Sequence, residues 1–135
     1  MNVLEEIKRD FEGAKMLSDW LGDDWRHVTR QKADHRGLAC LRGNGGQKCP
    51  YNVEPNWWER VKTRIAEVIR AQLAIKKKLA MTTTFDDQLH MCQQCGCALQ
   101  LKVHVPIEHI KAHTSPEVLA GFPEWCWQKR EITMS

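Results

Sequence analysis

Three cysteines fall within the six-residue stretch CQQCGC at positions 92–97. Cys92 and Cys95 are separated by two residues, the spacing at which one turn can direct two thiolates at a single metal ion. Gly96 frees the backbone after the turn, so that its N–H groups can donate hydrogen bonds to the sulfurs. The motif therefore predicts a metal site, with Cys97 following at the start of an expected strand.

Six cysteines in all are candidate metal ligands, because three more lie outside this motif. They are Cys40, Cys49, Cys92, Cys95, Cys97 and Cys126. One tetrahedral zinc ion needs four thiolates. The simplest set is Cys40, Cys49, Cys92 and Cys95. Cys97 or Cys126 is expected close by, and a second ion would need bridging sulfurs or an imidazole from His35, His90 or His104.

Zinc is the expected metal, and two alternatives remain open. An iron–sulfur cluster needs four thiolates in a dry pocket, which some of the six tryptophans could line. Disulfides or free buried thiols are the other alternative, and disulfides gain weight if the protein leaves the cell. Trp57, Trp58, Trp125 and Trp127 lie beside cysteines or expected helix starts, where they would cover a metal site or anchor a partner.

Motifs for catalysis are absent from the sequence. His109 and His113 are four residues apart, as metal-binding histidines on a helix can be, but no glutamate base stands between them and no third ligand is evident. There is no nucleophile elbow, phosphate-binding loop or dinucleotide fingerprint. We therefore expect a protein that is not an enzyme.

The composition fits one small domain that gains stability from a metal. The chain has 135 residues, of which 42% are hydrophobic, and a formal charge of +3. Residues 1–135 are thus expected to form a single metal-stabilised domain. The first residues are acidic and amphipathic, so no signal peptide is expected, and no apolar run reaches membrane-spanning length. We expect synthesis in the cytosol, where thiols stay reduced and cysteine clusters more often bind metal.

Helical periodicity marks two long segments. Apolar residues recur three and four apart in residues 1–22, which predicts an amphipathic helix with an acidic outer face. Residues 57–81 predict the longest helix, whose apolar stripe includes Trp58, Ile65 and Ile69. We expect the two helices to pack together, with these three side chains mostly buried.

Shorter elements are expected between and after these helices. One short helix should end near Gly37. Residues 99–105 alternate apolar and polar side chains, which predicts a half-buried strand with His104 on its polar face. Residues 90–127 should thus hold the cysteine turn, the strand and short helices, one of them capped by Ser115. The expected fold is mainly α with a small zinc-ribbon-like β element (α+β): two amphipathic helices stapled by a cysteine metal site.

Positive charge concentrates in the helix predicted at residues 57–81. Seven basic side chains face only two acidic ones there, which gives this segment a charge of +5 and the rest of the chain −2. A basic helix can follow the phosphates of nucleic acid. The run Lys76, Lys77 and Lys78 is more often a solvated helix end, where cations also interact favourably with the helix dipole.

Several motifs follow one another along residues 20–127. They are ADHR at 33–36 before Cys40, CPYN at 49–52, CQQCGCAL at 92–99, LKVHVPI at 101–107, and the closing Cys126. In these features the chain resembles a family of short cysteine-rich proteins encoded in bacteriophages and prophages. The resemblance covers about four-fifths of the chain. Its relatives hold the first two cysteines close together, whereas a glycine-rich insertion separates them here. The resemblance implies a viral setting and a metal site, but no reaction.

The expected function combines the metal site with the viral setting. It is that of a non-enzymatic, metal-binding phage structural protein, a virion or tail component that docks on other subunits within a large assembly. Such a protein would be made in the host cytoplasm and would need no membrane. One alternative is a zinc-stabilised regulator that binds nucleic acid through the basic helix. Another is an iron–sulfur redox or sensor protein.

Overall fold

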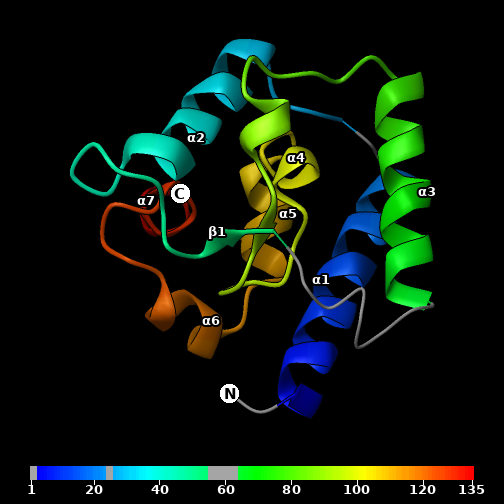
Figure 1. The fold of residues 1–135 in the computed structure, drawn as a ribbon, viewed down its shortest axis with the longest axis horizontal. Helices are drawn as coiled ribbons and strands as arrows, with labels where there is room; N and C mark the ends of the chain where they lie inside the picture. Colours follow the sequence, from blue (N-terminus) through cyan, green and yellow to red (C-terminus); the bar gives the residue numbers. More distant parts are fainter. Residues whose placement is uncertain (1–2, 24–25, 55–63) are drawn as a thin grey trace.

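The computed structural model describes residues 3–23, 26–54 and 64–135, which are mainly helical (Figure 1). The helices and strands of these ranges are α1 (Val3–Asp23), α2 (Arg30–Arg42), β1 (Asn52–Val53), α3 (Arg64–Lys78), the 3-10 helix η1 (Asp86–Gln88), β2 (Met91–Cys92), α4 (Leu99–Lys102), α5 (Ile107–Ala112), α6 (Pro116–Gly121) and α7 (Trp127–Met134). The two short strands form one antiparallel pair, with Asn52 opposite Cys92. A mainly helical chain with a small β element is what the sequence predicts.

The predicted pairing of the two long helices is confirmed, because α1 and α3 lie side by side (Figure 1). Leu17 and Trp20 of α1 are buried, and Ile69 of α3 is only 4% exposed, as predicted. A polar contact fixes the register: the buried Gln72 amide donates at 2.7 Å to the carbonyl oxygen of Ala14. The side chains of Trp58 and Ile65 lie outside the described residues.

The predicted strand at residues 99–105 is wrong, because the chain forms α4 and a turn there. The reason is burial on every side: Leu101, Val103 and Val105 are fully enclosed, and His104 on the supposed polar face is only 2% exposed. Alternating side chains therefore do not mark a solvent face here. The backbone closes locally, with the N–H of Val103 donating to the carbonyl of Leu99 at 3.2 Å.

Two helices also differ from the expected pattern. Helix α2 does not end near Gly37 but continues to Arg42. Gly37 lies inside the helix, where Phe85 and Leu89 pack against it. A Cβ on residue 37 would stand 3.4 Å from each of these side chains. Helix α7, which the periodicity did not predict, buries Trp127 on its inner face. The predicted cap of α6 is confirmed, since the Ser115 side chain accepts a hydrogen bond from the backbone of Val118.

A buried arginine joins α2, the turn after α4, and α7. The Arg36 guanidinium is fully buried and donates to the carbonyl oxygens of Val103 at 3.0 Å and Val105 at 2.7 Å. Its other edge meets the Glu131 carboxylate at 2.7 and 2.9 Å, and its carbon lies 4.5 Å from the centre of the Trp127 ring. Three segments far apart in sequence are held by one side chain.

None of the helices in the described ranges is long and apolar enough to cross a membrane.

The buried α4 region gives a direct test of the core. Replacing Leu101 with alanine removes a side chain with no exposed surface, so we expect the free energy of unfolding to fall by about 2–5 kcal/mol. The matched change Leu38→Ala, at a leucine that is 40% exposed, should change it by about 0.5 kcal/mol or less. Urea unfolding of both variants measures the difference, and equal losses would contradict the buried position of residue 101.

Candidate metal centre

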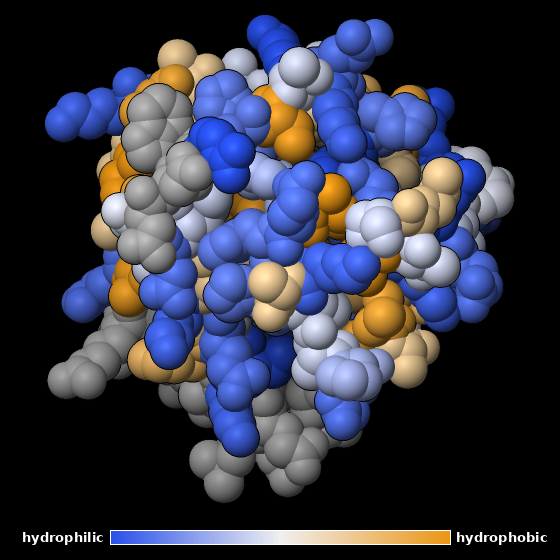
Figure 2. Space-filling model, turned by 180° about the vertical axis from the view of Figure 1, so that it is seen from behind, coloured by the Kyte–Doolittle hydropathy of each residue, from blue (hydrophilic) through white to orange (hydrophobic). Residues whose placement is uncertain are grey.

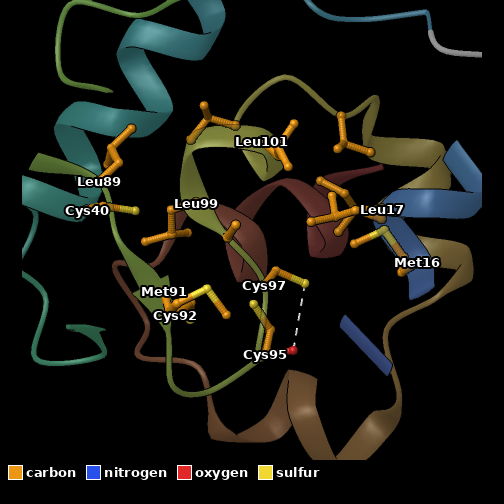
Figure 3. Close-up of a cluster of buried hydrophobic side chains, with 14 of the residues drawn as sticks. Met16, Leu17, Cys40, Leu89, Met91, Cys92, Cys95, Cys97, Leu99 and Leu101 are labelled. Carbon is orange, nitrogen blue, oxygen red and sulfur yellow. Dashed lines mark hydrogen bonds between the residues drawn. The ribbon is translucent and has the colours of Figure 1, made fainter. Parts of the chain in front are cut away.

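All six cysteines are buried and none is in a disulfide. Each exposes 8% or less of its surface. They come from the end of α2, the segment before β1, strand β2, the turn after it, and the N-cap of α7. Figure 3 shows Cys92, Cys95 and Cys97 gathered along one turn, with Cys40 approaching from α2 beside Leu99. The fold therefore brings together thiols that are up to 86 positions apart, from Cys40 to Cys126.

The turn between Cys92 and Cys97 is closed by two backbone hydrogen bonds. The N–H of Gly96 donates to the carbonyl of Cys92 at 2.7 Å, and the N–H of Cys92 donates to the carbonyl of Cys97 at 2.9 Å. Gly96 has a φ of +75°, and a Cβ there would stand 2.7 Å from the carbonyl oxygen of Arg9 in α1. Glycine is needed both for the turn and for the approach of α1.

Cys40 and Cys49 are brought together despite the glycine-rich loop between them. The backbone N–H of Cys49 donates to the carbonyl of Cys40 at 2.8 Å. Pairing of β1 with β2 then places this segment against the cysteine turn, where the N–H of Gln93 donates to the carbonyl of Tyr51 at 2.8 Å. The predicted meeting of the two cysteine segments is what this part of the structure shows.

Four of the thiols line one small cavity of about 10 Å³. They are Cys40, Cys49, Cys92 and Cys126. The remaining walls are largely aromatic and aliphatic and include Tyr51, Leu99, Phe122, Trp125 and Trp127. Such walls exclude water from the sulfurs. Trp57 and Trp58, the other tryptophans expected near the metal, lie outside the described residues.

Side chains from α7 reach the sulfurs directly. The indole N–H of Trp127 donates to the sulfur of Cys40 at 3.3 Å. The Gln128 amide donates to the sulfur of Cys95 at 3.7 Å. Donors aimed at sulfur stabilise a thiolate and orient it, as outer-shell groups do around metal–thiolate sites.

Lys102 is the residue of this site that sequence reasoning missed. The residue is only 2% exposed and lines the same pocket as Cys95 and Cys97. No carboxylate forms an ion pair with it within the described ranges. A buried ammonium requires a negative partner, and sulfur is the partner available here. No sequence pattern could have revealed this role, because the absence of a carboxylate partner for Lys102 in the described ranges is a property of the folded chain.

The electrostatics of the turn favour one thiolate. Burial alone raises the pKa of Cys95, but hydrogen bonds from Cys92 and Cys97 and the charge of Lys102 hold it well below the ordinary value. The pKa values of Cys92 and Cys97 are raised, first by their interaction with Cys95 and then by burial. Burial lowers the pKa of Lys102, yet the cysteine charges raise it above the ordinary value.

Burial raises the pKa of three of the thiols around the cavity. Burial raises the pKa of Cys40 to about 12, although the hydrogen bond from Trp127 lowers it in part. Burial also raises the pKa of Cys126 to about 11 and raises that of Cys49. Cys95 contributes to all three shifts, so its sulfur lies within electrostatic reach of the cavity. In the described part of the chain, no three His, Cys, Asp or Glu side chains have the arrangement of a metal site.

The histidines do not line the cysteine cavity in the described structure. His35 is exposed. His90 lies 4.0 Å from Glu54. His104 is buried, and burial, helped by the charge of Lys76, lowers its pKa to about 4. His109 and His113 stack at 4.2 Å between ring centres, and His109 Nε2 lies 3.2 Å from the carbonyl oxygen of Met16.

The basic run of α3 is divided between the interior and the surface. Lys76 is buried and forms a 2.8 Å ion pair with Asp86 of η1. Arg70, Lys77 and Lys78 are exposed. The predicted basic helix therefore exposes fewer cations than its charge count suggests within the described part of α3.

No family model, curated protein or solved structure matches this chain.

The pairing of Lys102 with Cys95 can be measured in reduced, metal-free protein. Lys102→Met leaves burial unopposed by a positive charge, so we expect the pKa of Cys95 to rise. The thiolate–ammonium pair stabilises the native state above the lowered pKa of Cys95 and below the raised pKa of Lys102, and it is lost as pH falls through the former. Ultraviolet absorbance of the thiolate against pH measures the shift. The control Lys77→Met, at an exposed lysine, should not change the titration, and an unchanged titration in Lys102→Met would contradict the pairing.

Proposed function

We propose that the chain is a non-enzymatic phage structural protein whose fold is closed by a zinc–thiolate centre. The observation that supports the metal is the gathering of six buried, unbridged thiols, four around one cavity and two, Cys95 and Cys97, beside a buried lysine that has no carboxylate partner in the described residues. A zinc ion bound by four thiolates carries a net negative charge. Lys102 would balance that charge inside the protein. A cluster of protonated thiols would instead leave the buried lysine without a negative partner.

The proposed ligands are three thiols of the cavity together with one from the cysteine turn. Cys40, Cys49 and Cys126 come from separate segments and line the same space. From the turn, Cys92 lines the cavity, whereas Cys95 has the lowered pKa and affects all three of the others. Compared with the simplest expected set of Cys40, Cys49, Cys92 and Cys95, Cys126 therefore takes the place of one of the two turn cysteines. Metal binding would draw these sulfurs inward and make the small β element zinc-ribbon-like.

An iron–sulfur cluster is the alternative cofactor, and the aromatic walls favour it to a degree. A cluster requires four thiolates in a dry pocket, and Phe122, Trp125 and Trp127 supply such walls. The cavity of about 10 Å³ is small for a multi-atom cluster, which is why we favour a single zinc ion. The alternative would make the protein a redox or sensor protein.

The structural role is supported by the surface and by the resemblance to phage-encoded proteins. Large apolar side chains are exposed on four helices: Phe11, Leu38, Ile75 and Met134. Figure 2 shows apolar side chains as separate patches on one hydrophilic face. Single exposed apolar residues are common, but aromatic and aliphatic anchors are what a docking surface uses. We infer a component of a virion or tail, made in the host cytoplasm and docked on other subunits.

Nucleic-acid binding through α3 is the second candidate function. Arg70, Lys77 and Lys78 remain exposed on this helix, and cations spaced along a helix can contact phosphates. The ion pair of Lys76 with Asp86 reduces the charge that this surface offers.

Metal content is the first test of the proposal. We expect the purified protein to carry about one zinc ion per chain, to melt at a lower temperature after chelation, and to lose the metal in acid because thiolates take up protons. Cys40→Ser, Cys49→Ser and Cys126→Ser should each lose metal, while Cys97→Ser should retain it. Elemental analysis and thermal melting measure both effects.

Comparison of Cys92→Ser with Cys95→Ser then shows which thiol of the turn binds the ion. Visible absorption with bound iron would favour the cluster instead, because zinc is colourless. A metal-free protein that melts identically with and without chelator would contradict both forms of the proposal.

The docking role predicts that the protein is present in purified phage particles. Leu38→Glu places a charge on an exposed leucine of α2, so we expect less protein in the particles and an unchanged melting temperature, because interface cores exclude unpaired charge. The control Gln31→Glu adds the same charge at an exposed polar position of the same helix. Quantitative mass spectrometry of the particles measures both, and absence of the wild-type protein from them would exclude the role.

A further inference from the structure

A surface groove of about 290 Å³ lies between α2 and α7 and shares Trp125 and Trp127 with the cysteine cavity. Helices α2 and α7 lie close together where the chain ends (Figure 1). The groove is lined by Lys32, His35, Ala39, Trp125, Trp127, Arg130, Glu131 and Met134. Its volume is at the lower end of the range for pockets that bind small organic ligands. It combines aromatic, cationic and apolar side chains that are remote in sequence.

The aromatic part of the groove is held rigidly. Trp125 is half-buried and packs against Gly43, where a Cβ would stand 3.0 Å from its ring. Trp127 is fixed by the Arg36 guanidinium over its ring and by its hydrogen bond to Cys40. A preformed indole surface of this kind costs little conformational entropy when a flat ligand stacks on it.

The charged part of the groove is net positive. Glu131 is its only carboxylate among the described lining residues, and it already binds Arg36 at 2.7 Å and Lys32 at 3.4 Å. Burial raises the pKa of Glu131, but the Arg36 hydrogen bond lowers it below the ordinary value. Arg130 is exposed, and its guanidinium has no ion pair with any described residue. Lys32, Arg130 and His35 therefore offer donors to an anion.

We propose that this groove binds single-stranded nucleic acid, with a base against Trp125 and a phosphate at Arg130 and Lys32. Fixed aromatic rings beside cations are the elements that single-strand sites share. An acidic peptide would satisfy the cations, but its carboxylates would be repelled by the electron-rich faces of the indoles. The observations thus favour a nucleotide chain. This activity goes beyond the structural role and does not depend on α3.

Binding of a labelled oligothymidine of about ten nucleotides, at about 50 mM salt, tests the proposal by fluorescence anisotropy. Arg130→Gln changes an exposed residue, so folding should be unaffected, and we expect affinity to fall about tenfold. Trp125→Leu should lower affinity by a similar factor, whereas Trp125→Phe, which keeps an aromatic face, should retain most of it. Circular dichroism verifies that both Trp125 variants are folded.

The matched control is Lys78→Gln, which removes one exposed positive charge from α3 and should leave affinity unchanged. If Lys78→Gln and Arg130→Gln lowered the affinity for oligothymidine equally, the groove would be ruled out as the binding site in favour of a diffuse basic surface. Competition by polyglutamate as strong as that by unlabelled oligothymidine would overturn stacking and favour an acidic peptide. Wild-type protein that does not bind the oligothymidine at this salt concentration would also overturn the proposal.

Discussion

The Arg36 guanidinium is the interaction on which the arrangement of the other segments depends. The chain turns sharply after α4, and the carbonyls of Val103 and Val105 both accept from this one group. Those carbonyls are buried, so without a donor they would carry a desolvation cost. Glu131 supplies the opposite charge, and Trp127 covers the planar face. Arginine is suited to this position because its rigid fork satisfies several acceptors at once.

Lys102 presents a second buried cation with a different partner. Arg36 forms an ion pair with a carboxylate, whereas Lys102 lies in one pocket with the thiols of Cys95 and Cys97. A fold that encloses a lysine without a carboxylate partner in the described residues must supply negative charge in another form. Thiolates supply it, and a metal ion is the usual reason for several thiolates to be collected in a protein interior. The buried lysine is therefore a second observation, beside the cysteines, that supports the proposed metal centre.

Helix α7 links the proposed metal centre to the groove. Cys126 precedes the helix and lines the cavity, while Trp127 contacts Cys40 on one side and lines the groove on the other. Glu131, one turn further, meets Arg36. The proposed metal centre and the aromatic surface of the groove thus share Trp127 of this short helix.

The sequence by itself determined the features that depend on local geometry. The spacing of Cys92 and Cys95 with Gly96 specified the turn, the helical period of residues 1–22 specified α1, and Ser115 capped α6 as predicted.

Tertiary structure decided the features that depend on contacts between remote segments. Residues 99–105 form a helix and a turn that are enclosed on all sides. The segment has no solvent-exposed face, so its alternation of apolar and polar residues did not indicate a strand. The partners of Lys102, the place of Cys126 at the cavity, and the meeting of Lys32 with Arg130 in one groove depend on contacts between remote segments. No local pattern records such contacts, because they depend on how segments remote in sequence pack against one another in the whole fold.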